Sequence, residues 1–232
     1  MIGCVMTEPN DDQGTMVRWE DHIAPILEHP DIHIRNKALV AVAWESHARP
    51  SELHRLTFGD VEDRGDHVAI LITRRDGQKR LLTLDESMPY FKQWVQAEHP
   101  VTEWLAPDAD PLEDASSEMP IWTQIDSNKR IPYMMLYDIT NRACERSDVP
   151  TKFTLHDIRR SRAKLLIAQS GLRAHRLREL FGWGLQVPKE FIETAEDGDL
   201  DEDSRPQLCI RCPNCGVWTL RNRPCIWCGL SR

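Results

Sequence analysis

Apolar residues recur every three to four positions along most of this chain, which is the spacing of a helix with one buried face. The pattern predicts helices over residues 17–28, from a cap at Asp31 to about residue 47, over 88–99 and 131–146, from 154 onward, and over 187–195. In the 131–146 helix the expected core face consists of Met134, Leu136, Ile139 and Ala143. Most of the chain should therefore be helical.

The predicted helix that ends near residue 47 is apolar on most faces, so we expect it to be buried. The next segment, ARPSELHRLTFGDV at 48–61, turns a corner between two helices. Pro50 suits the first turn of the second helix, and Leu53 and Leu56 should face inward. Arg49 is therefore expected at a rigid bend.

Residues 66–73 and 79–84 are typical of two strands joined by a turn at Asp76 and Gly77. This hairpin would carry Arg74 and Arg75 at its tip. Residues 100–128 are loop-like, with a short strand expected at 120–123. The predicted fold class is mainly α with a small antiparallel β-hairpin or sheet.

The two ends of the chain differ from its middle part. Residues 1–14 are polar and lack periodicity, as in a disordered leader. Residues 196–203 include six acidic side chains, which cannot pack, so 196–206 should be a solvated linker. The expected main domain is then 15–195, followed after the linker by a small unit at 207–232.

Charge is distributed unevenly along the chain. The composition, 41% hydrophobic and 28% charged, is that of a soluble protein, and the net charge is −8. Residues 129–190, however, contain thirteen Lys and Arg against six Asp and Glu. A basic face on an acidic protein indicates double-stranded DNA as a partner. Arg outnumbers Lys by twenty-two to seven, which is typical of a salt-adapted, for example haloarchaeal, host, although compositional drift explains it equally well.

Membrane insertion and secretion are not expected. No apolar run reaches the roughly 18 residues that span a bilayer. Residues 1–13 lack the basic and then apolar pattern of a secretion signal. We therefore expect a cytoplasmic protein with no membrane partner.

Five of the seven cysteines lie in the last 24 residues, a spacing that favours metal binding over disulfides in a chain without a secretion signal. CPNCG at 212–216 and CIWCG at 225–229 are two Cys-x-x-Cys knuckles with the glycine that the tight turn requires. They predict a zinc ribbon in which four thiolates hold one structural Zn²⁺. The expected ligands are Cys212, Cys215, Cys225 and Cys228, with Cys209 as a substitute for Cys212 or a bystander. A redox pair or free thiols are the alternatives.

Residues 154–184 contain the main candidate chemistry. His156 and Arg159 are three residues apart, so on a helix they share a face and could reach one anion. A helix N-terminus also favours negative charge through its dipole and free N–H groups. This indicates phosphate binding; the alternative is a solvated basic helix in which His156 is a capping or core residue. Further DNA contacts are expected from Arg160, Arg162, Lys164, Arg173 and Arg176.

Three separated motifs occur in the order found in the catalytic domain of tyrosine recombinases, the phage integrase family. Residues 48–61 resemble that family's first arginine motif, and the basic hairpin resembles its lysine-bearing hairpin. LHDIRRSRAKLL at 155–166 resembles the His-x-x-Arg helix, and LRELFGWG at 177–184 resembles the following His-or-Trp motif. The resemblance covers residues 17–195 and implies the fold of that catalytic domain, without the family's usual N-terminal DNA-clamping domain.

The resemblance implies that Arg49 and Arg159 clamp the non-bridging oxygens of a scissile phosphate. Guanidinium groups fit phosphate geometry, and phosphoryl transfer depends mainly on positioning and charge stabilisation. By the same comparison, His156 assists proton movement or binds phosphate, and Trp183 takes the place that other members give to His. Glu52 resembles an acidic residue that supports the arginine corner; an ordinary helix glutamate is the alternative.

Two positions depart from the family pattern. The place of the lysine that protonates the leaving 5′ oxygen holds Arg75, a poor acid because its pKa exceeds about 12. Lys79 substitutes for it if the hairpin alignment slips. The place of the nucleophilic tyrosine holds Phe191, which has no oxygen to attack phosphorus. The chain's three tyrosines all precede His156: Tyr90, Tyr133 and Tyr137.

We therefore expect a DNA-binding member of the tyrosine recombinase family, involved in DNA recombination or integration, in which cleavage is impaired or lost. One alternative is an active recombinase, which takes its tyrosine from elsewhere and forms a 3′-phosphotyrosyl intermediate. Another is a zinc-ribbon adaptor that binds protein. Other recombinase subunits are further candidate partners.

Overall fold

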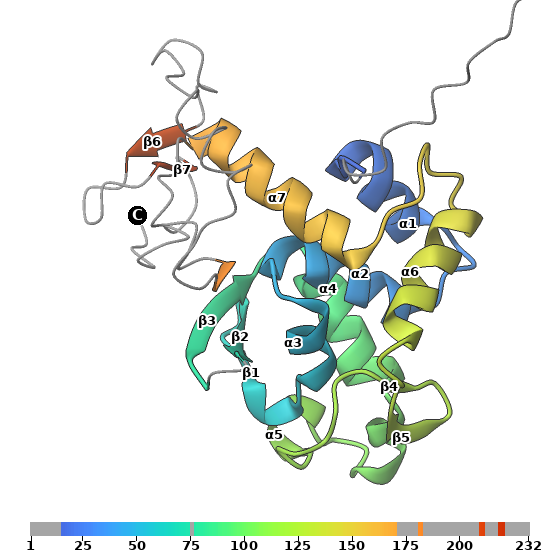
Figure 1. The fold of residues 1–232 in the computed structure, drawn as a ribbon. Helices are drawn as coiled ribbons and strands as arrows, with labels where there is room; N and C mark the ends of the chain where they lie inside the picture. Colours follow the sequence, from blue (N-terminus) through green and yellow to red (C-terminus); the bar gives the residue numbers. More distant parts are fainter. Residues whose placement is uncertain (1–14, 75–76, 171–180, 183–208, 212–217, 221–232) are drawn as a thin grey trace, which may run out of the picture.

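The computed structural model describes residues 15–74, 77–170, 181–182, 209–211 and 218–220 (Figure 1). The helices are η1 (Trp19–Ile23), α1 (Ala24–Glu28), α2 (Ile34–Ser46), α3 (Pro50–Arg55), η2 (Phe58–Asp60), α4 (Met88–Lys92), η3 (Gln93–Glu98), η4 (Pro100–Trp104), α5 (Pro111–Asp114), α6 (Met135–Arg146) and α7 (Leu155–Ser170). The strands are β1 (Val61–Asp63), β2 (Val68–Thr73), β3 (Lys79–Leu84), β4 (Thr123–Gln124), β5 (Ser127–Arg130), β6 (Cys209–Arg211) and β7 (Trp218–Leu220). The predicted fold class, mainly α with small antiparallel sheets, is confirmed.

Helix α2 forms the centre of the helical part, where α4, α6 and α7 pack against it (Figure 1). All residues from 38 to 44 are at most 2% exposed. A helix that is apolar all round has to be covered on every side, because no face can be left in water without exposing apolar surface. The predicted burial of this helix is confirmed.

The start of α2 differs from the prediction. The chain is still in a turn at Asp31, whose backbone N–H donates to Nδ1 of His29 at 3.2 Å. The helix begins three residues later at Ile34, and His33 caps it by accepting from the backbone N–H of Arg35 at 3.1 Å. The predicted Asp31 cap is therefore wrong, because an imidazole nitrogen takes the role that sequence patterns assign to a carboxylate.

The predicted hairpin is confirmed as β2 and β3, which pair antiparallel from Thr73 opposite Lys79 to Val68 opposite Leu84. The short strand β1, which was not predicted, pairs with the other edge of β2. Burial alternates along β3, so that residues 80, 82 and 84 face the protein and residues 79, 81 and 83 face outward. This register decides which basic side chains of the hairpin point inward.

The part from 100 to 134 differs most from the prediction. It forms η4, α5 and the pair β4–β5 instead of a long loop with one strand at 120–123. Helix α6 begins at Met135, later than expected, because the Ile131 N–H donates to Trp122 O at 3.1 Å and extends the strand pairing. Met134 is 65% exposed, so its predicted place in the core is wrong; the expected core residues Leu136, Ile139 and Ala143 are buried.

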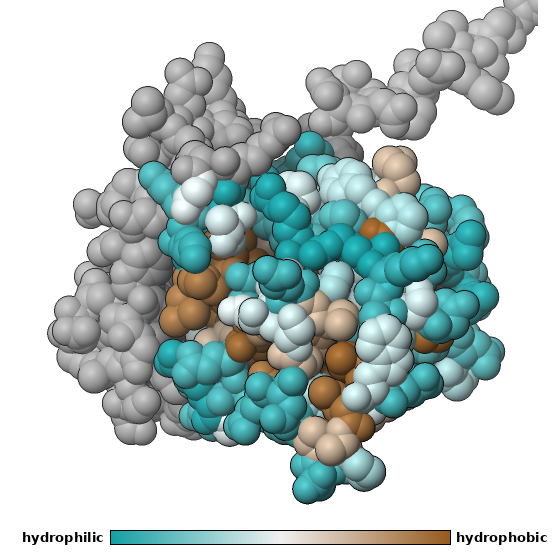
Figure 2. Space-filling view, turned by 90° about the horizontal axis from the view of Figure 1, so that it is seen from below, coloured by the Kyte–Doolittle hydropathy of each residue, from teal (hydrophilic) through white to brown (hydrophobic). Residues whose placement is uncertain are grey.

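The surface seen in Figure 2 is largely hydrophilic, with small apolar patches separated by polar side chains. Small exposed apolar patches of this kind are normal on protein surfaces. Among the described residues, no helix has the length and apolar character needed to cross a membrane.

Candidate functional site

The corner between α2 and α3 fixes the position of Arg49. Pro50 occupies the first helical position, where the missing N–H costs no hydrogen bond. Arg49 is the preceding N-cap residue with an extended backbone, and its side chain is 36% exposed. Leu53 and Leu56 are buried beneath the corner, as predicted. The arginine therefore projects from the end of a helix that the core holds in place.

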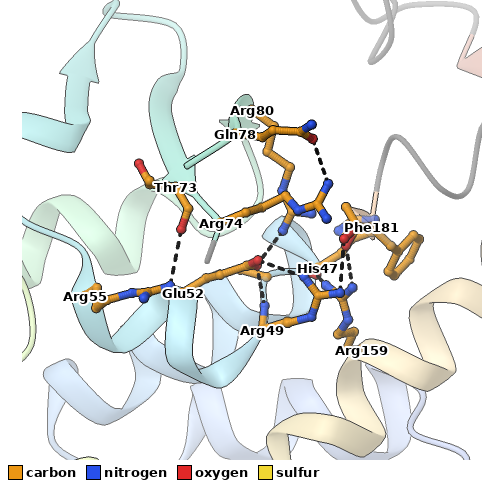
Figure 3. A network of polar contacts seen from close by, with 12 residues as sticks. His47, Arg49, Glu52, Arg55, Thr73, Arg74, Gln78, Arg80, Arg159 and Phe181 are labelled. Atoms are coloured by element: carbon orange, nitrogen blue, oxygen red, sulfur yellow. Dashed lines mark hydrogen bonds and ion pairs between the residues drawn. The ribbon is translucent and has the colours of Figure 1, made fainter. Parts of the chain in front are cut away.

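Glu52 lies one turn into α3 and connects the corner to the hairpin (Figure 3). Its carboxylate accepts hydrogen bonds from the backbone N–H of Arg49 at 2.8 Å, from Arg49 Nη1 at 3.0 Å and from Arg80 Nη2 at 2.8 Å. The carboxylate side chain is only 2% exposed. A buried carboxylate requires such donors, so Glu52 supports the arginine corner structurally, as the resemblance implied.

Arg159 reaches the same place from α7. It is 7% exposed, and its two terminal nitrogens donate to the backbone carbonyls of His47 and Phe181. Its guanidinium also lies 5.1 Å from the centre of the Phe181 ring. Burial, with the nearby charges of Arg49 and Arg80, lowers the pKa of Arg159 to about 9. These contacts make Arg159 the inner member of the pair and Arg49 the outer one.

The hairpin contributes arginines other than the predicted one. Arg75 lies outside the described residues, and Lys79, the first residue of β3, faces outward. Arg80, which the sequence analysis did not select, points inward to Glu52 with a side chain that is 11% exposed. Arg74, at the end of β2, donates to Gln78 Oε1 at 2.9 Å and lies beside Arg80 (Figure 3). The alternation of β3 was the signal that could have identified Arg80.

Gly182 closes the site against the hairpin. Its φ of +56° lies in the left-handed region, and a Cβ there would be 2.6 Å from Arg80 Nη1 and 3.0 Å from Arg74 Cδ. Its carbonyl accepts from Arg49 Nη2 at 3.0 Å. Glycine is therefore required both by the backbone conformation and by the close approach of the two hairpin arginines.

His156 lies at the start of α7, one helical turn before Arg159. Thr154 and Asp157 cap this helix through reciprocal hydrogen bonds, which set where its first turn begins. The partly exposed His156 ring contacts Tyr137 of α6, with 3.2 Å between Nε2 and the phenol oxygen. Partial burial, followed by the charge of Arg159, lowers the pKa of His156. These surroundings therefore favour the neutral imidazole over the imidazolium.

The other predicted DNA-contacting residues differ in their surroundings. Arg160 and Lys164 are half-buried on α7. The Arg162 guanidinium lies 4.8 Å from the centre of the Trp44 ring, and burial lowers the pKa of Arg162. Much of this side chain therefore packs against the protein instead of facing solvent. Several predicted site residues lie outside the described residues: Arg173, Arg176, Trp183, Phe191, Cys212, Cys215, Cys225 and Cys228.

We call Arg49, Arg74, Arg80 and Arg159, together with Glu52, the arginine cluster. Among the charged groups that act on Arg159, the three other arginines lower its pKa and the carboxylate alone raises it. Counted over the described residues, the cluster therefore has an excess of positive charge in a partly buried setting, where charge interactions are stronger than in water. Such a site favours an anion with several oxygens, such as phosphate.

Comparison with known proteins gives a consistent result. The sequence model of the Phage integrase family matches residues 19–185, more than half of the chain. No curated protein sequence matches significantly.

Solved structures share the fold at low sequence identity. XerA recombinase has 16% identity and a TM-score of 0.58 over 78% of this chain and 61% of its own. XerH site-specific recombinase, bound to difH substrate in a pre-cleavage complex, has 16% identity and a TM-score of 0.55 over 76% of this chain and 47% of its own. The Tn1549 transposon integrase, in complex with circular intermediate DNA, has 13% identity and a TM-score of 0.53 over 80% of this chain and 62% of its own. In each case the match spans less than two thirds of the other protein.

Proposed function

The chain belongs to the phage integrase family, and we propose that it is a DNA-binding protein of recombination or integration that grips a duplex phosphate with Arg49, His156 and Arg159. The observation that carries this proposal is the arginine cluster, in which Arg49 and Arg80 bond one buried carboxylate while the charges of Arg74 and Arg159 lie nearby. Phosphate oxygens supply the negative charge that the cluster lacks. The titles of the XerH and Tn1549 structures, which describe complexes with DNA, support the same type of partner.

The two arginines of the pair contribute differently in this proposal. Arg49 is the more exposed, and its Nη2 bonds only the Gly182 carbonyl among the described residues. A phosphate oxygen is a stronger acceptor than a peptide carbonyl, so it can replace that partner. Arg159 stays hydrogen-bonded to two backbone carbonyls, so it attracts the phosphate through its positive charge from a more deeply buried position. His156 approaches the phosphate from the start of the same helix.

We propose that strand cleavage is impaired in this protein. Phe191, at the sequence position that corresponds to the family's nucleophile, has no reactive oxygen. The described hairpin residues that reach the cluster are Arg74 and Arg80, and guanidinium groups give up protons poorly. The proposed protein therefore binds the phosphate without the nucleophile and without the lysine acid.

We also propose that Cys212, Cys215, Cys225 and Cys228 hold a structural Zn²⁺. The sequence spacing carries this proposal. The antiparallel pairing of β6 with β7 is compatible with it, because the first knuckle then falls in the connection between two paired strands. Zinc would supply most of the folding free energy of so short a unit, on the order of 10 kcal/mol.

The test is a conservative pair of variants on α3. Arg49→Lys keeps the positive charge but loses the planar fork, so we expect duplex affinity to fall by about tenfold, the equivalent of about 1.4 kcal/mol. Arg55→Lys makes the same change at an exposed residue whose bond to Thr73 O is 3.4 Å long, and should bind DNA like the parent. Equal affinity in both variants would overturn the proposed phosphate contact.

Incubation of the parent protein with a suicide DNA substrate tests the second part of the proposal. We expect no covalent protein–DNA adduct. An adduct would show an active recombinase that supplies its tyrosine from another position. Protein binding without any salt-dependent DNA affinity would instead favour the zinc-ribbon adaptor.

A further inference from the structure

Two tyrosine hydroxyls and one imidazole form a hydrogen-bonded chain beside the phosphate site. Tyr133 Oη lies 3.2 Å from Tyr137 Oη, which in turn lies 3.2 Å from His156 Nε2. This hydrogen-bonded chain contacts α3, because the His54 ring packs edge-on against the Tyr133 ring with 5.5 Å between the ring centres. His54 is itself held by a 2.8 Å hydrogen bond to Ile131 O. The hydroxyls are thus fixed relative to the helix that carries Arg49.

A hydroxyl has one proton, so the chain can be ordered in only two directions. In one direction Tyr133 donates to Tyr137, Tyr137 donates to Nε2 of His156, and the ring proton of the neutral imidazole is on Nδ1. In the other direction Nε2 carries the proton and Nδ1 presents a lone pair. Among the described residues, Nε2 is the ring nitrogen that meets a tyrosine, and none is hydrogen-bonded to Nδ1.

We propose that Tyr137, supported by Tyr133, is a positioning residue that donates to Nε2 of His156, so that the Nδ1–H of the neutral ring donates to a phosphate oxygen. A phosphate oxygen only accepts hydrogen bonds, so a bound phosphate selects this direction of the hydrogen-bonded chain. This inference rests on the proposed phosphate binding at the site. The opposite tautomer would aim a lone pair at the phosphate and would bind only after protonation. The tyrosine pair therefore allows His156 to serve as a phosphate ligand without carrying a charge.

The electrostatics of His156 make this device useful. On its own helix the ring faces Arg159 and Arg160, which disfavour the imidazolium, and Asp157, which favours it; from α6 it faces Tyr137. Partial burial is the largest contribution, and its combined effect with the arginines is to lower the pKa of His156. Tyr137 keeps its proton as well, because burial and Tyr133 raise its pKa to about 12. The phenol is therefore available as a donor throughout the physiological range.

The test compares duplex affinity at pH 8.0 and at a pH below the His156 titration, which ¹⁵N chemical shifts of the ring locate, at constant salt, for the parent and Tyr137→Phe. We expect the variant to bind about tenfold more weakly at pH 8.0, the loss typical of one charge-assisted hydrogen bond. At the lower pH the imidazolium donates from both nitrogens, so the difference should disappear. Tyr90→Phe removes a phenol oxygen on α4 and serves as the matched control, with parent-like affinity at both pH values.

The coupling to His156 is tested in a second background. In His156→Ala the additional Tyr137→Phe change should have no effect at either pH, since the tyrosine acts through the imidazole. An equal loss at both pH values, a loss that persists without His156, or no loss at all would overturn the proposal. A covalent DNA adduct mapped to Tyr137 would also overturn it, because the phenol would then be the nucleophile.

Failure of the proposed function can be recognised separately. If the parent protein binds no DNA, ¹⁵N chemical shifts of the His156 ring still report the tautomer. A protonated Nδ1 in the parent and a protonated Nε2 in Tyr137→Phe would support the positioning role alone. The same tautomer in both proteins would refute it.

Discussion

Replacement of Glu52 by glutamine tests whether the arginine cluster depends on its single carboxylate. Glu52→Gln keeps the size of the side chain but removes the charge that accepts from Arg49 Nη1 and from Arg80 Nη2, at 3.0 Å and 2.8 Å. The amide also brings an N–H group toward at least one guanidinium donor. The change should destabilise the fold and leave the cluster with more excess positive charge.

The magnitude follows from the burial of the partners. Removing one member of a buried ion pair costs about 3–5 kcal/mol. The side chains of Glu52 and Arg80 are 2% and 11% exposed, so their interaction belongs to this class. Arg49 is 36% exposed, and solvent screens its share. We therefore expect a loss near the lower limit, about 3 kcal/mol, which lowers the Tm of a protein of this size by about 9 °C.

The assay is thermal and urea unfolding of the parent, Glu52→Gln and the control Glu62→Gln. Glu62 also bonds an arginine, Arg64 Nη2 at 2.9 Å, but its side chain is 63% exposed and its loss should leave stability unchanged. Added inorganic phosphate should restore stability to Glu52→Gln more than to the parent, because a bound anion replaces the lost charge. If the two glutamine variants unfold alike, or if phosphate stabilises neither, the reasoning about the cluster is refuted.

Three further outcomes are expected. Burial lowers the pKa of His99 from 6.5 to about 4, so between these values the unfolded state binds more protons, and stability should decrease as the pH is lowered from 6.5 to 4, by up to about 3 kcal/mol. His99→Gln should lack this dependence in urea titrations, and an unchanged profile would contradict the assignment. The purified protein should contain one Zn²⁺ per chain and Cys212→Ser should contain none; unchanged zinc in that variant would identify Cys209 as the ligand, and a zinc-free parent would end the proposal. Phe191→Tyr supplies the missing oxygen at nearly constant volume, so adduct formation on a suicide substrate, mapped by mass spectrometry to residue 191, would demonstrate an otherwise intact pocket. If no adduct forms, the double variant Phe191→Tyr with Arg75→Lys tests whether the missing lysine acid is the reason. Absence of an adduct from the double variant would contradict the assignment of position 191.

The elements that could be predicted from the sequence are those whose cause is local. Seven consecutive apolar residues, 38 to 44, made α2 recognisable as a buried helix, and the Asp76–Gly77 turn between two apolar runs identified the β2–β3 hairpin. Pro50 and the leucines after it located the corner of Arg49 in the same way. Errors occurred where an unusual group took over a local role, as at the cap of α2, where His33 replaces Asp31.

The contacts of the candidate site were decided by the tertiary structure. Glu52 and Arg80 are 28 residues apart, Tyr137 and His156 are 19 apart, and Arg49 and Gly182 are 133 apart. Helical or strand periodicity states which face a side chain occupies, but not which other face it meets, because that depends on the angles at which α3, α6, α7 and the hairpin pack. The sequence therefore determined the family of the chain and the residues that carry its charge, whereas packing determined that Arg80 joins the cluster and that a tyrosine pair contacts His156.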